Sequence, residues 1–474
     1  MTALVAGLAV APASAADEQR YLVVADTTVA GLDETILPRS AEETLESYEG
    51  VDAAVAQMSA AQAAAVDAQP GVVVSPDGPM TTQDWSGRGA AAGTEVRLLA
   101  AASSWGQDRI DQRDLPLNRR YTLNSGVNGR GVHVYVVDSG IDLDHPELAG
   151  RVGQSWSFAQ DGLGPDDVNG HGTHVAGTIG STVFGVAPAV TLHSVRVLDS
   201  TGGATFSRFV AAMSFVATNA VRPAVVNASL GGPYNAAVNQ AVENLVRAGI
   251  TVVVAAGNNA ADAAGYSPGS APSAITVAAS DAADRYAGFS NYGRSVDMVA
   301  PGVAIDSTNA GNPAYAARDS GTSMAAPHVT GWVALYLQHH RTASPATIRQ
   351  ALVSTATRGR IANEVSGTPD LLPYTSAVKA PTVAPAAKKP SLRVTTPKKA
   401  KVRVNLDPNR KAQGYWAVKV LKLVKGSYVS VRSVRTKGAK EIAVVNVPRG
   451  RYVVKVPPQH GFAATTSRSV FVRR

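Results

Sequence analysis

The stretch Gly321-Thr322-Ser323-Met324-Ala325-Ala326-Pro327-His328 joins a tight turn of small residues to the mostly apolar run 329–337. This order predicts a loop followed by a helix, with the hydroxyl of Ser323 exposed at the junction. A helix N-terminus favours negative charge nearby, because its first N–H groups have no partner within the helix. Such a serine could attack a carbonyl carbon, but it would need a neighbouring base, and the base would need an orienting group.

Around this stretch, short apolar runs rich in β-branched residues alternate with helical patterns. Alternation of this kind predicts an α/β fold, in which a parallel sheet is sandwiched by helices. We expect this domain to span residues 104–376. The predicted strands are 132–137, 195–198, 224–227, 250–255 and 274–277, and the predicted helices are 174–179, 206–220, 236–248 and 327–340.

The N-terminal part of the chain reads as three segments. Residues 1–15 are apolar and end in small residues, which predicts a signal peptide. No Lys or Arg precedes the apolar run, so we expect residue 1 to lie inside a longer signal sequence. Residues 20–80 predict a small α/β unit, with a strand at 21–24, helices at 41–48 and 59–67, and a turn followed by a final strand at 70–77. Residues 81–103 are rich in Gly, Ala and Ser and predict a linker open to proteolysis.

Export without a membrane anchor fits the rest of the composition. No later run reaches the roughly 18 apolar residues that a membrane span requires. The chain has no Cys, so it has no disulfide framework and no thiol chemistry. We therefore expect a secreted protein whose stability outside the cell depends on packing and on metal binding.

The C-terminal part is strongly basic. From residue 377 onward the chain carries 23 Lys and Arg against 2 Asp and Glu, whereas the preceding part carries 21 against 34. Residues 377–401 predict an extended linker, and 402–474 predict a β-sandwich-like domain. Its charge suggests three interpretations: a solvated sheet face, a surface for anionic polymers such as those of the cell wall, or a surface that assembles with the acidic body. No nucleic-acid motif is present.

Three further residues complete the chemistry that Ser323 requires. Asp138 ends the predicted strand 132–137, and His171 lies between glycines where a helix begins. Carboxyl ends of parallel strands and the helix starts that follow them meet at one edge of a sheet. There Asp138 would orient His171, which would remove the proton of Ser323. Asn258, in the turn after another strand, would donate to the oxyanion together with the N–H of Ser323.

With these motifs the sequence resembles the subtilisin family of serine proteases, in its proteinase K-like branch. The resemblance covers about residues 105–353 and also includes the segments 227–232, 256–258, 266–268 and 289–293. The chain order Asp, His, Ser is that of subtilisins. Residues 20–80 resemble the family's inhibitory pro-segment.

The resemblance also implies binding residues. The substrate peptide would pair as an added strand between two strand edges of the protease. The side chain before the scissile bond would enter a pocket walled by small residues, which favours large apolar side chains and broad specificity. A structural Ca²⁺ would bind two backbone carbonyls and one carboxylate, unless that carboxylate is an ordinary turn or capping residue, and catalysis would need no cofactor. The substrate-binding residues would be Gly202, Gly203, Ala204, Ser229, Leu230, Gly231, Ala256 and Gly257, and the metal ligands would be Pro272, Ala274 and Asp297.

The leading hypothesis is therefore a secreted, monomeric serine endopeptidase that processes its own precursor. Its partners would be protein or peptide substrates and its own pro-segment, with no nucleic acid. We expect the maturation cut between residues 102 and 105. Two alternatives remain: a binding protein in which the basic domain carries the function, and an esterase that uses the same triad.

Overall fold

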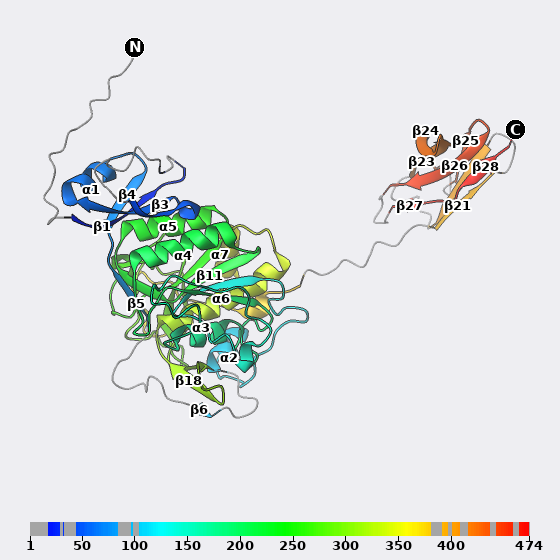
Figure 1. The fold of residues 1–474 in the computed structure, drawn as a ribbon. Helices are drawn as coiled ribbons and strands as arrows, with labels where there is room; N and C mark the ends of the chain where they lie inside the picture. The colour runs from blue at the N-terminus through cyan, green and yellow to red at the C-terminus, as the bar shows by residue number, and fades with distance from the viewer. Residues whose placement is uncertain are drawn as a thin grey trace, which may run out of the picture. The chain divides into compact units, whose positions relative to one another are not determined.

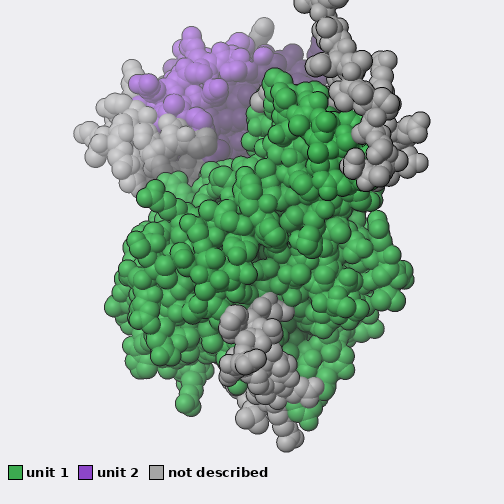
Figure 2. Space-filling view, turned by 90° about the vertical axis from the view of Figure 1, so that its left-hand side faces the viewer, with its two compact units in different colours: residues 1–380 green, residues 381–474 purple. Residues whose placement is uncertain are grey.

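A computed structural model of the chain describes residues 18–28, 32, 44–83, 96–97, 104–380, 391–396, 401–407, 416–436, 442–457 and 464–473. The chain divides into two compact units, residues 1–380 and 381–474, which Figure 2 colours green and purple. The predicted signal peptide lies outside the described residues. None of the helices in the described ranges is long and apolar enough to cross a membrane.

The first unit is built on a seven-stranded sheet with the order β16-β15-β13-β11-β7-β9-β8. All neighbouring strands are parallel, so the predicted α/β fold is confirmed. The five predicted strands overlap β7, β9, β11, β13 and β15. The strands are β7 (His133–Asp138), β8 (Trp156–Ser157), β9 (Thr191–Arg196), β11 (Ala224–Ala228), β13 (Thr251–Ala255), β15 (Ile275–Ser280) and β16 (Met298–Pro301).

Alternate residues of these strands bury against helices on opposite faces of the sheet, because strand side chains point alternately up and down. Val225 and Val253 join one buried cluster with residues of α3 and α6, whereas Val226 and Val252 join a second cluster with residues of α4 and α5. From residue 104 onward, the helices of this unit are α2 (Trp105–Asp111), α3 (His171–Gly180), α4 (Phe206–Asn219), α5 (Ala236–Arg247), α6 (Thr322–His339) and α7 (Pro345–Thr355).

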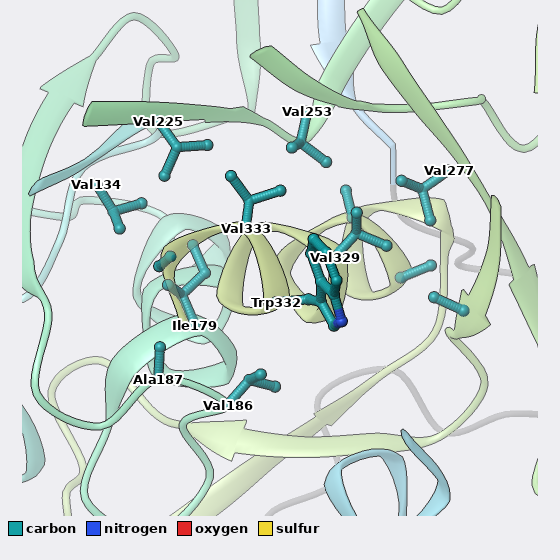
Figure 3. Packing of buried hydrophobic residues seen from close by; sticks show 14 of the residues in the cluster. Val134, Ile179, Val186, Ala187, Val225, Val253, Val277, Val329, Trp332 and Val333 are labelled. Atoms are coloured by element: carbon teal, nitrogen blue, oxygen red, sulfur yellow. The ribbon is translucent and has the colours of Figure 1, made fainter. Parts of the chain in front are cut away.

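Helix α6 is the central helix of the first cluster. In Figure 3, Val329 and Val333 point from α6 toward Val225 and Val253 of the sheet, and Ile179 of α3 lies nearby. All of these side chains are fully buried. Burial of a Val or Ile side chain stabilises a fold by roughly 1.5–3 kcal/mol, so α6 is held firmly at the sheet.

The N-terminal segment forms its own four-stranded antiparallel sheet, in the order β2-β3-β1-β4. Figure 1 shows this sheet, in blue, over α4 and α5. Helix α1 begins with a capping box, in which Ser59 and Gln62 bond reciprocally. The elements are β1 (Glu18–Ala25), β2 (Thr44–Tyr48), β3 (Ala53–Ser59), α1 (Ala60–Asp67) and β4 (Val72–Pro76).

The helix predicted at 41–48 is wrong for the residues that the structure describes. Thr44–Tyr48 form strand β2 and pair with β3, which the sequence analysis did not predict. Five residues span little more than one helical turn, so their periodicity hardly separates helix from strand. Pairing with β3 therefore decides the conformation.

Shorter elements complete the first unit. A second sheet has the order β10-β5-β12-β14 and a third has the order β17-β18-β6, while β19 pairs with β20. Their bounds are β5 (Pro79–Thr82), β6 (Val96–Arg97), β10 (Gly203–Thr205), β12 (Leu230–Pro233), β14 (Tyr266–Ser267), β17 (Ile305–Thr308), β18 (Tyr315–Asp319), β19 (Thr357–Arg358) and β20 (Leu371–Leu372). The 3-10 turns are η2 (Glu49–Val51), η3 (Pro146–Leu148), η4 (Ala263–Gly265) and η5 (Thr375–Ala377).

The second unit consists of two antiparallel sheets that share one buried cluster, as the predicted β-sandwich-like domain requires. One sheet has the order β21-β22-β25, and the other has β24-β23-β26-β27 with β28 paired to β26. The strands are β21 (Ser391–Thr395), β22 (Lys401–Asp407), β23 (Ala417–Val424), β24 (Ser427–Arg435), β25 (Ile442–Asn446), β26 (Gly450–Val456), β27 (Thr465–Thr466) and β28 (Val470–Val472).

Both predicted linkers are shorter than expected. In the predicted linker 377–401, Val378 is 4 % exposed and its carbonyl accepts a hydrogen bond from Asn124, so this end belongs to the first unit. At the other end of that linker, β21 pairs with β22. Thr81 and Thr82, which we assigned to the linker 81–103, belong to β5. Composition indicated linkers here, but strand pairing places Thr81, Thr82 and the residues of β21 in sheets, and burial places Val378 in the first unit.

Candidate active site

Asp138 is the last residue of β7, at the point where the strand order changes direction. The chain passes from β7 to β9 on one side and then to β11 on the other side. Ligand and catalytic groups gather at such switch points in parallel sheets. Asp138 is fully buried. Burial raises the pKa of its carboxyl, while His171 and the Ser139 N–H, both bonded to Oδ1, lower it.

His171 is the first residue of α3, and its ring is bonded to Asp138. The distance between Nδ1 of His171 and Oδ1 of Asp138 is 2.6 Å. The next residue, Gly172, packs so closely that a Cβ there would lie 2.1 Å from the carbonyl oxygen of Gly140 and 3.1 Å from Asp138. Glycine therefore allows α3 to start directly against the end of β7, and this contact brings the imidazole to the carboxylate.

Asp167 organises the loop that leads into α3. Its Oδ1 accepts hydrogen bonds from Ser139 Oγ (2.9 Å) and from the backbone N–H of Gly170 (2.9 Å). Its Oδ2 accepts from the N–H of Thr173 (2.9 Å) in the first turn of the helix. A carboxylate at a helix N-terminus is favoured by the unpaired N–H groups there. Asp167 thus ties the turn after β7 to the start of the helix that carries His171.

Ser323 is the second residue of α6, not a residue of the loop before it. We expected the helix to begin at Pro327, because proline rarely occurs inside helices. Pro327 has no N–H to donate to the carbonyl oxygen of Ser323, four residues earlier, and Ser229 Oγ donates to that oxygen instead (2.9 Å). The hydroxyl of Ser323 donates in turn to the carbonyl of Ser229 (2.9 Å). The bond from Ser229 Oγ to the carbonyl of Ser323 replaces the missing helical hydrogen bond, so the helix continues through Pro327.

Asn258 lies in a turn that two buried groups hold in place. Its Oδ1 accepts a hydrogen bond from the N–H of Thr322 (2.9 Å), and its Nδ2 donates to the carbonyl of Gln83. Gly257 has a φ of +105°, and a Cβ there would lie 2.3 Å from Nδ2 of Asn291. Asn291 donates to the carbonyl of Ala256 (3.0 Å) and accepts from the N–H of Asn259 (2.8 Å). The amide of Asn258 is therefore positioned before any substrate arrives.

The end of the N-terminal segment lies between the two predicted substrate-binding edges. Strand β5 pairs with β10 on one side and with β12 on the other. In these ladders Thr81 is opposite both Gly203 and Gly231, Met80 is opposite Ala204, and Thr82 is opposite Leu230. The N–H of Thr82 donates to the carbonyl of Gly202 (3.2 Å).

Gln83, directly after β5, brings the predicted residues together. The N–H of Gln83 donates to the carbonyl of Ser229 (3.3 Å), and its own carbonyl accepts from the N–H of Ser323 (3.2 Å). The same carbonyl accepts a short hydrogen bond from Nδ2 of Asn258. A peptide carbonyl thus occupies the position between two donors that an oxyanion would take.

The side chain of Gln83 lies between the two predicted pocket walls. Its Nε2 donates to the carbonyl of Gly231 (3.3 Å). A Cβ at Gly231 would lie 3.5 Å from Cδ of Gln83, and one at Gly257 would lie 3.5 Å from Oε1. The Cα atoms of Gly231 and Gly257, together with Ala256 beside them, leave room for a long side chain.

The residues predicted to bind calcium are engaged by an arginine. Nη1 of Arg349 donates to the carbonyl of Pro272 (2.7 Å), and its Nε donates to Oδ1 of Asp297 (2.9 Å). Oδ2 of Asp297 accepts from the N–H of Thr276 (2.9 Å). The carbonyl of Pro272 and both carboxylate oxygens of Asp297 already accept hydrogen bonds from N–H groups, so in this arrangement they do not fit a calcium ion. Across the described residues, no three His, Asp or Glu side chains gather into a metal-binding cluster.

Four residues of this region were missed by the sequence analysis. Asp167 follows another aspartate in a polar turn just before α3, which was a usable signal. Asn291 lies in a segment on which the resemblance was based, but no role was assigned to it. Gln83 and Arg349 carry no local signal, because each acts through partners far away in the sequence.

The chain is similar to several known proteins. Residues 129–374, more than half of the chain, match the Subtilase family. The chain is 50 % identical to an extracellular serine proteinase of Thermus sp. (strain Rt41A) over 286 residues, which cover 60 % of this chain and 69 % of that protein. It is 41 % identical to proteinase R of Parengyodontium album over 278 residues, covering 57 % and 69 %.

A solved structure is similar as well. A cold-adapted subtilisin-like serine proteinase superposes with a TM-score of 0.56 at 41 % identity, covering 58 % of this chain and 98 % of that one. The parallel sheet, the Asp138–His171 pair and the position of Ser323 at the start of α6 lie within residues 129–374, which the family model matches. The chain therefore belongs to the subtilase family and is a subtilisin-like serine endopeptidase.

Proposed function

We propose that this subtilase is an extracellular protease in which Asp138, His171 and Ser323 form the catalytic triad. The 2.6 Å bond between Asp138 and His171 supports the first half of this triad. Two relatives are named an extracellular serine proteinase and an alkaline serine exoprotease, which supports secretion. Asn258 and the N–H of Ser323 would bind the oxyanion.

In the proposed mechanism, the hydroxyl of Ser323 turns from the carbonyl of Ser229 toward His171. His171 takes the hydroxyl proton as Oγ attacks the substrate carbonyl carbon, and Asp138 stabilises the imidazolium that results. The imidazolium then protonates the leaving amine, and the acyl group stays on Ser323. A water molecule, deprotonated by the same imidazole, hydrolyses this ester and regenerates the serine.

We further propose that the enzyme cuts its own precursor after Gln83. The observation that carries this proposal is the carbonyl of Gln83, which accepts hydrogen bonds from both Asn258 and Ser323. In this arrangement the bond between residues 83 and 84 is the one presented to Ser323. The segment up to Gln83 would then remain bound as a product and inhibit the enzyme. This site replaces the cut that we expected between residues 102 and 105.

N-terminal sequencing and intact mass of the secreted protein test this cut. Wild-type protein should yield a chain that begins at residue 84, and Ser323→Ala should accumulate as the uncut precursor. Gln83→Pro should block the cut, because proline removes the N–H that bonds to Ser229. A mature chain that still forms in Ser323→Ala would show that another protease performs the processing.

Substrate recognition would follow the path of β5. The side chain before the cut would enter the pocket between Gly231 and Gly257, whose small walls suit large apolar side chains and broad specificity. Met80, three residues earlier, is 1 % exposed and belongs to the buried cluster of Phe206 and Leu230. A second apolar side chain at that position should therefore favour cleavage. Pairing on both edges supports peptides over simple esters; a peptide-library digest tests both preferences.

For the second unit we propose binding to an anionic polymer. Lys419 in β23 lies opposite Lys455 in β26, and both side chains are exposed. Like charges directly opposite each other destabilise a sheet, and a bound polyanion would relieve this repulsion. Retention on isolated anionic cell wall should fall when residues 381–474 are deleted and in Lys419→Ala/Lys455→Ala. The turn variant Lys425→Asn should bind normally; equal retention of all variants contradicts this proposal.

A further inference from the structure

Arg349 occupies the position where the family resemblance leads us to expect a calcium ion. Its guanidinium donates to the carbonyl of Pro272 and to Oδ1 of Asp297, two of the three groups expected to bind the metal. Both Nε and Nη2 contact the same carboxylate oxygen. We propose that the guanidinium of Arg349 replaces the metal ion here, so that this part of the fold is stable without calcium.

The donor set supports this replacement. Calcium takes six to eight oxygen ligands whose lone pairs face the ion. Here Oδ1 of Asp297 faces the guanidinium, and Oδ2 accepts from the N–H of Thr276 (2.9 Å). The N–H of Asp297 donates back to the carbonyl of Thr276 (2.8 Å), which fixes the carboxylate in this orientation. A calcium ion next to the guanidinium would also be repelled by a like charge. The two cations therefore exclude each other.

The position of Arg349 explains what the replacement stabilises. Arg349 is on α7, whose only buried side chains are Ile348 and Leu352. Pro272 precedes β15, and Asp297 directly precedes β16, the neighbouring strand. The guanidinium thus fastens a helix with a small apolar face to the starts of two strands. The chain has no Cys, so no disulfide can provide this connection.

The burial of the pair sets the size of the effect. The side chain of Asp297 is 11 % exposed, whereas that of Arg349 is 36 % exposed. Solvent weakens an ion pair that is partly exposed, but two additional hydrogen-bonded groups, the carbonyl of Pro272 and the N–H of Thr276, belong to the same network. We therefore expect a moderate loss of stability when either partner is removed, with a melting temperature lower by roughly 2–4 °C.

Thermal unfolding of the full chain in EDTA and in calcium chloride tests the proposal, with Ser323→Ala as the parent so that autolysis does not interfere. Asp297→Asn should lower the melting temperature equally in both solutions, since the missing partner is an arginine and not a metal. Arg349→Ala should lower it in EDTA. The double variant should unfold close to the single variants, because both changes remove one interaction.

The opposite results would overturn the proposal. The first is that Asp297→Asn lowers the melting temperature only in calcium chloride, while EDTA lowers the melting temperature of the parent to that of the variant. The second is an Arg349→Ala variant that unfolds at the parent's temperature in EDTA. The third is full additivity in the double variant. Gln350→Ala, an exposed neighbour on the same helix, serves as the control and should change nothing.

Discussion

The amide of Asn258 is held in place by the residues around it. Thr322 donates to its oxygen from both the backbone N–H (2.9 Å) and the hydroxyl (3.0 Å). These bonds fix the orientation of the amide, so that its nitrogen donates to the carbonyl of Gln83. A donor that is fixed in advance stabilises a developing charge without reorganising during the reaction.

Asn258→Ala should therefore lower kcat much more than it changes KM. Loss of one oxyanion donor costs about 10²–10³ in kcat, a magnitude measured on a subtilisin donor of this kind. Steady-state kinetics on a peptide substrate measures the effect. The exposed neighbour Asn259→Ala is the matched control. Comparable losses in both variants would indicate a disturbed turn and not a missing donor.

His328 is a buried histidine of α6 that has no part in the proposed mechanism. Its ring is fully buried, and Nδ1 donates to the carbonyl of Met324 (2.8 Å). A Cβ at Gly106 would lie 2.3 Å from Nε2, so the ring is closely packed. Burial, with a smaller contribution from His174, lowers the pKa of His328 from its ordinary 6.5 to about 4.

This pKa predicts acid sensitivity. Below pH 6.5 the unfolded chain takes up a proton at this site that the folded protein accepts only near pH 4. The free energy of unfolding should therefore decrease as the pH falls through this window, by an amount on the order of 3 kcal/mol. Chemical unfolding of Ser323→Ala between pH 8 and pH 4 measures the slope.

His328→Gln in that background should unfold with a shallower pH dependence, since the titrating group is gone. The exposed residue His340 provides the control, because His340→Gln should keep the parent's slope. Identical slopes for His328→Gln and the parent would show that other groups account for the acid sensitivity.

At the scale of elements, α6 combines a proline with an unbroken helical path. The helix runs from Thr322 to His339 with Pro327 inside it. Ser229, at the start of the β12 edge, supplies the hydrogen bond that Pro327 cannot give. The predicted substrate-binding edge and the helix that carries the proposed nucleophile are thereby joined directly.

Ser229→Ala should leave the carbonyl of Ser323 without this bond and lower the free energy of unfolding by about 1–3 kcal/mol. The same change should cost less in Pro327→Ala, whose new N–H can donate to that carbonyl along the helix. Denaturant unfolding of the four variants in a double-mutant cycle measures the difference. Equal losses in both backgrounds would rule out the compensation.

At the scale of the whole molecule, the N-terminal segment binds the protease through its strands and through carboxylates, of which Asp26 pairs with Arg247 (2.9 Å). Asp77 accepts hydrogen bonds from the N–H (2.9 Å) and the hydroxyl (2.7 Å) of Ser207, in the first turn of α4. Asn244 of α5 donates to the carbonyls of Ala25 and Val51 (both 2.7 Å). These contacts lie far from Ser323 in the sequence but direct β5 toward it.

A separate N-terminal segment that carries Asp77→Ala should inhibit the mature enzyme roughly 10–100-fold less strongly. Hydrogen bonds to charged groups contribute about 1.5–3 kcal/mol each, and 1.4 kcal/mol corresponds to a tenfold change in affinity. Inhibition constants measure this effect. The exposed carboxylate of Glu49 offers the control Glu49→Gln. Unchanged inhibition by the Asp77 variant would mean that this carboxylate does not contribute to binding.

Much of the fold and the candidate residues could be predicted from the sequence alone. Runs of Val and Ile predict buried parallel strands because such side chains pack on both faces of a sheet, and five of the seven strands of the central sheet were found in this way. Asp138, His171, Ser323 and Asn258 were selected because they follow strands or begin helices. Their catalytic roles stay predictions that the experiments above address.

Only the tertiary structure decided the remaining features, because these depend on contacts between distant segments. The short segment at Thr44–Tyr48 is a strand because β3 pairs with it. Gln83 lies in a stretch that reads as a linker, yet Asn258 and Ser323 bind its carbonyl. The family resemblance assigns Asp297 to calcium, but Arg349, 52 residues later, pairs with it. A local pattern records the preference of a segment, whereas the partner that satisfies a carbonyl or a carboxylate is determined by the folded chain.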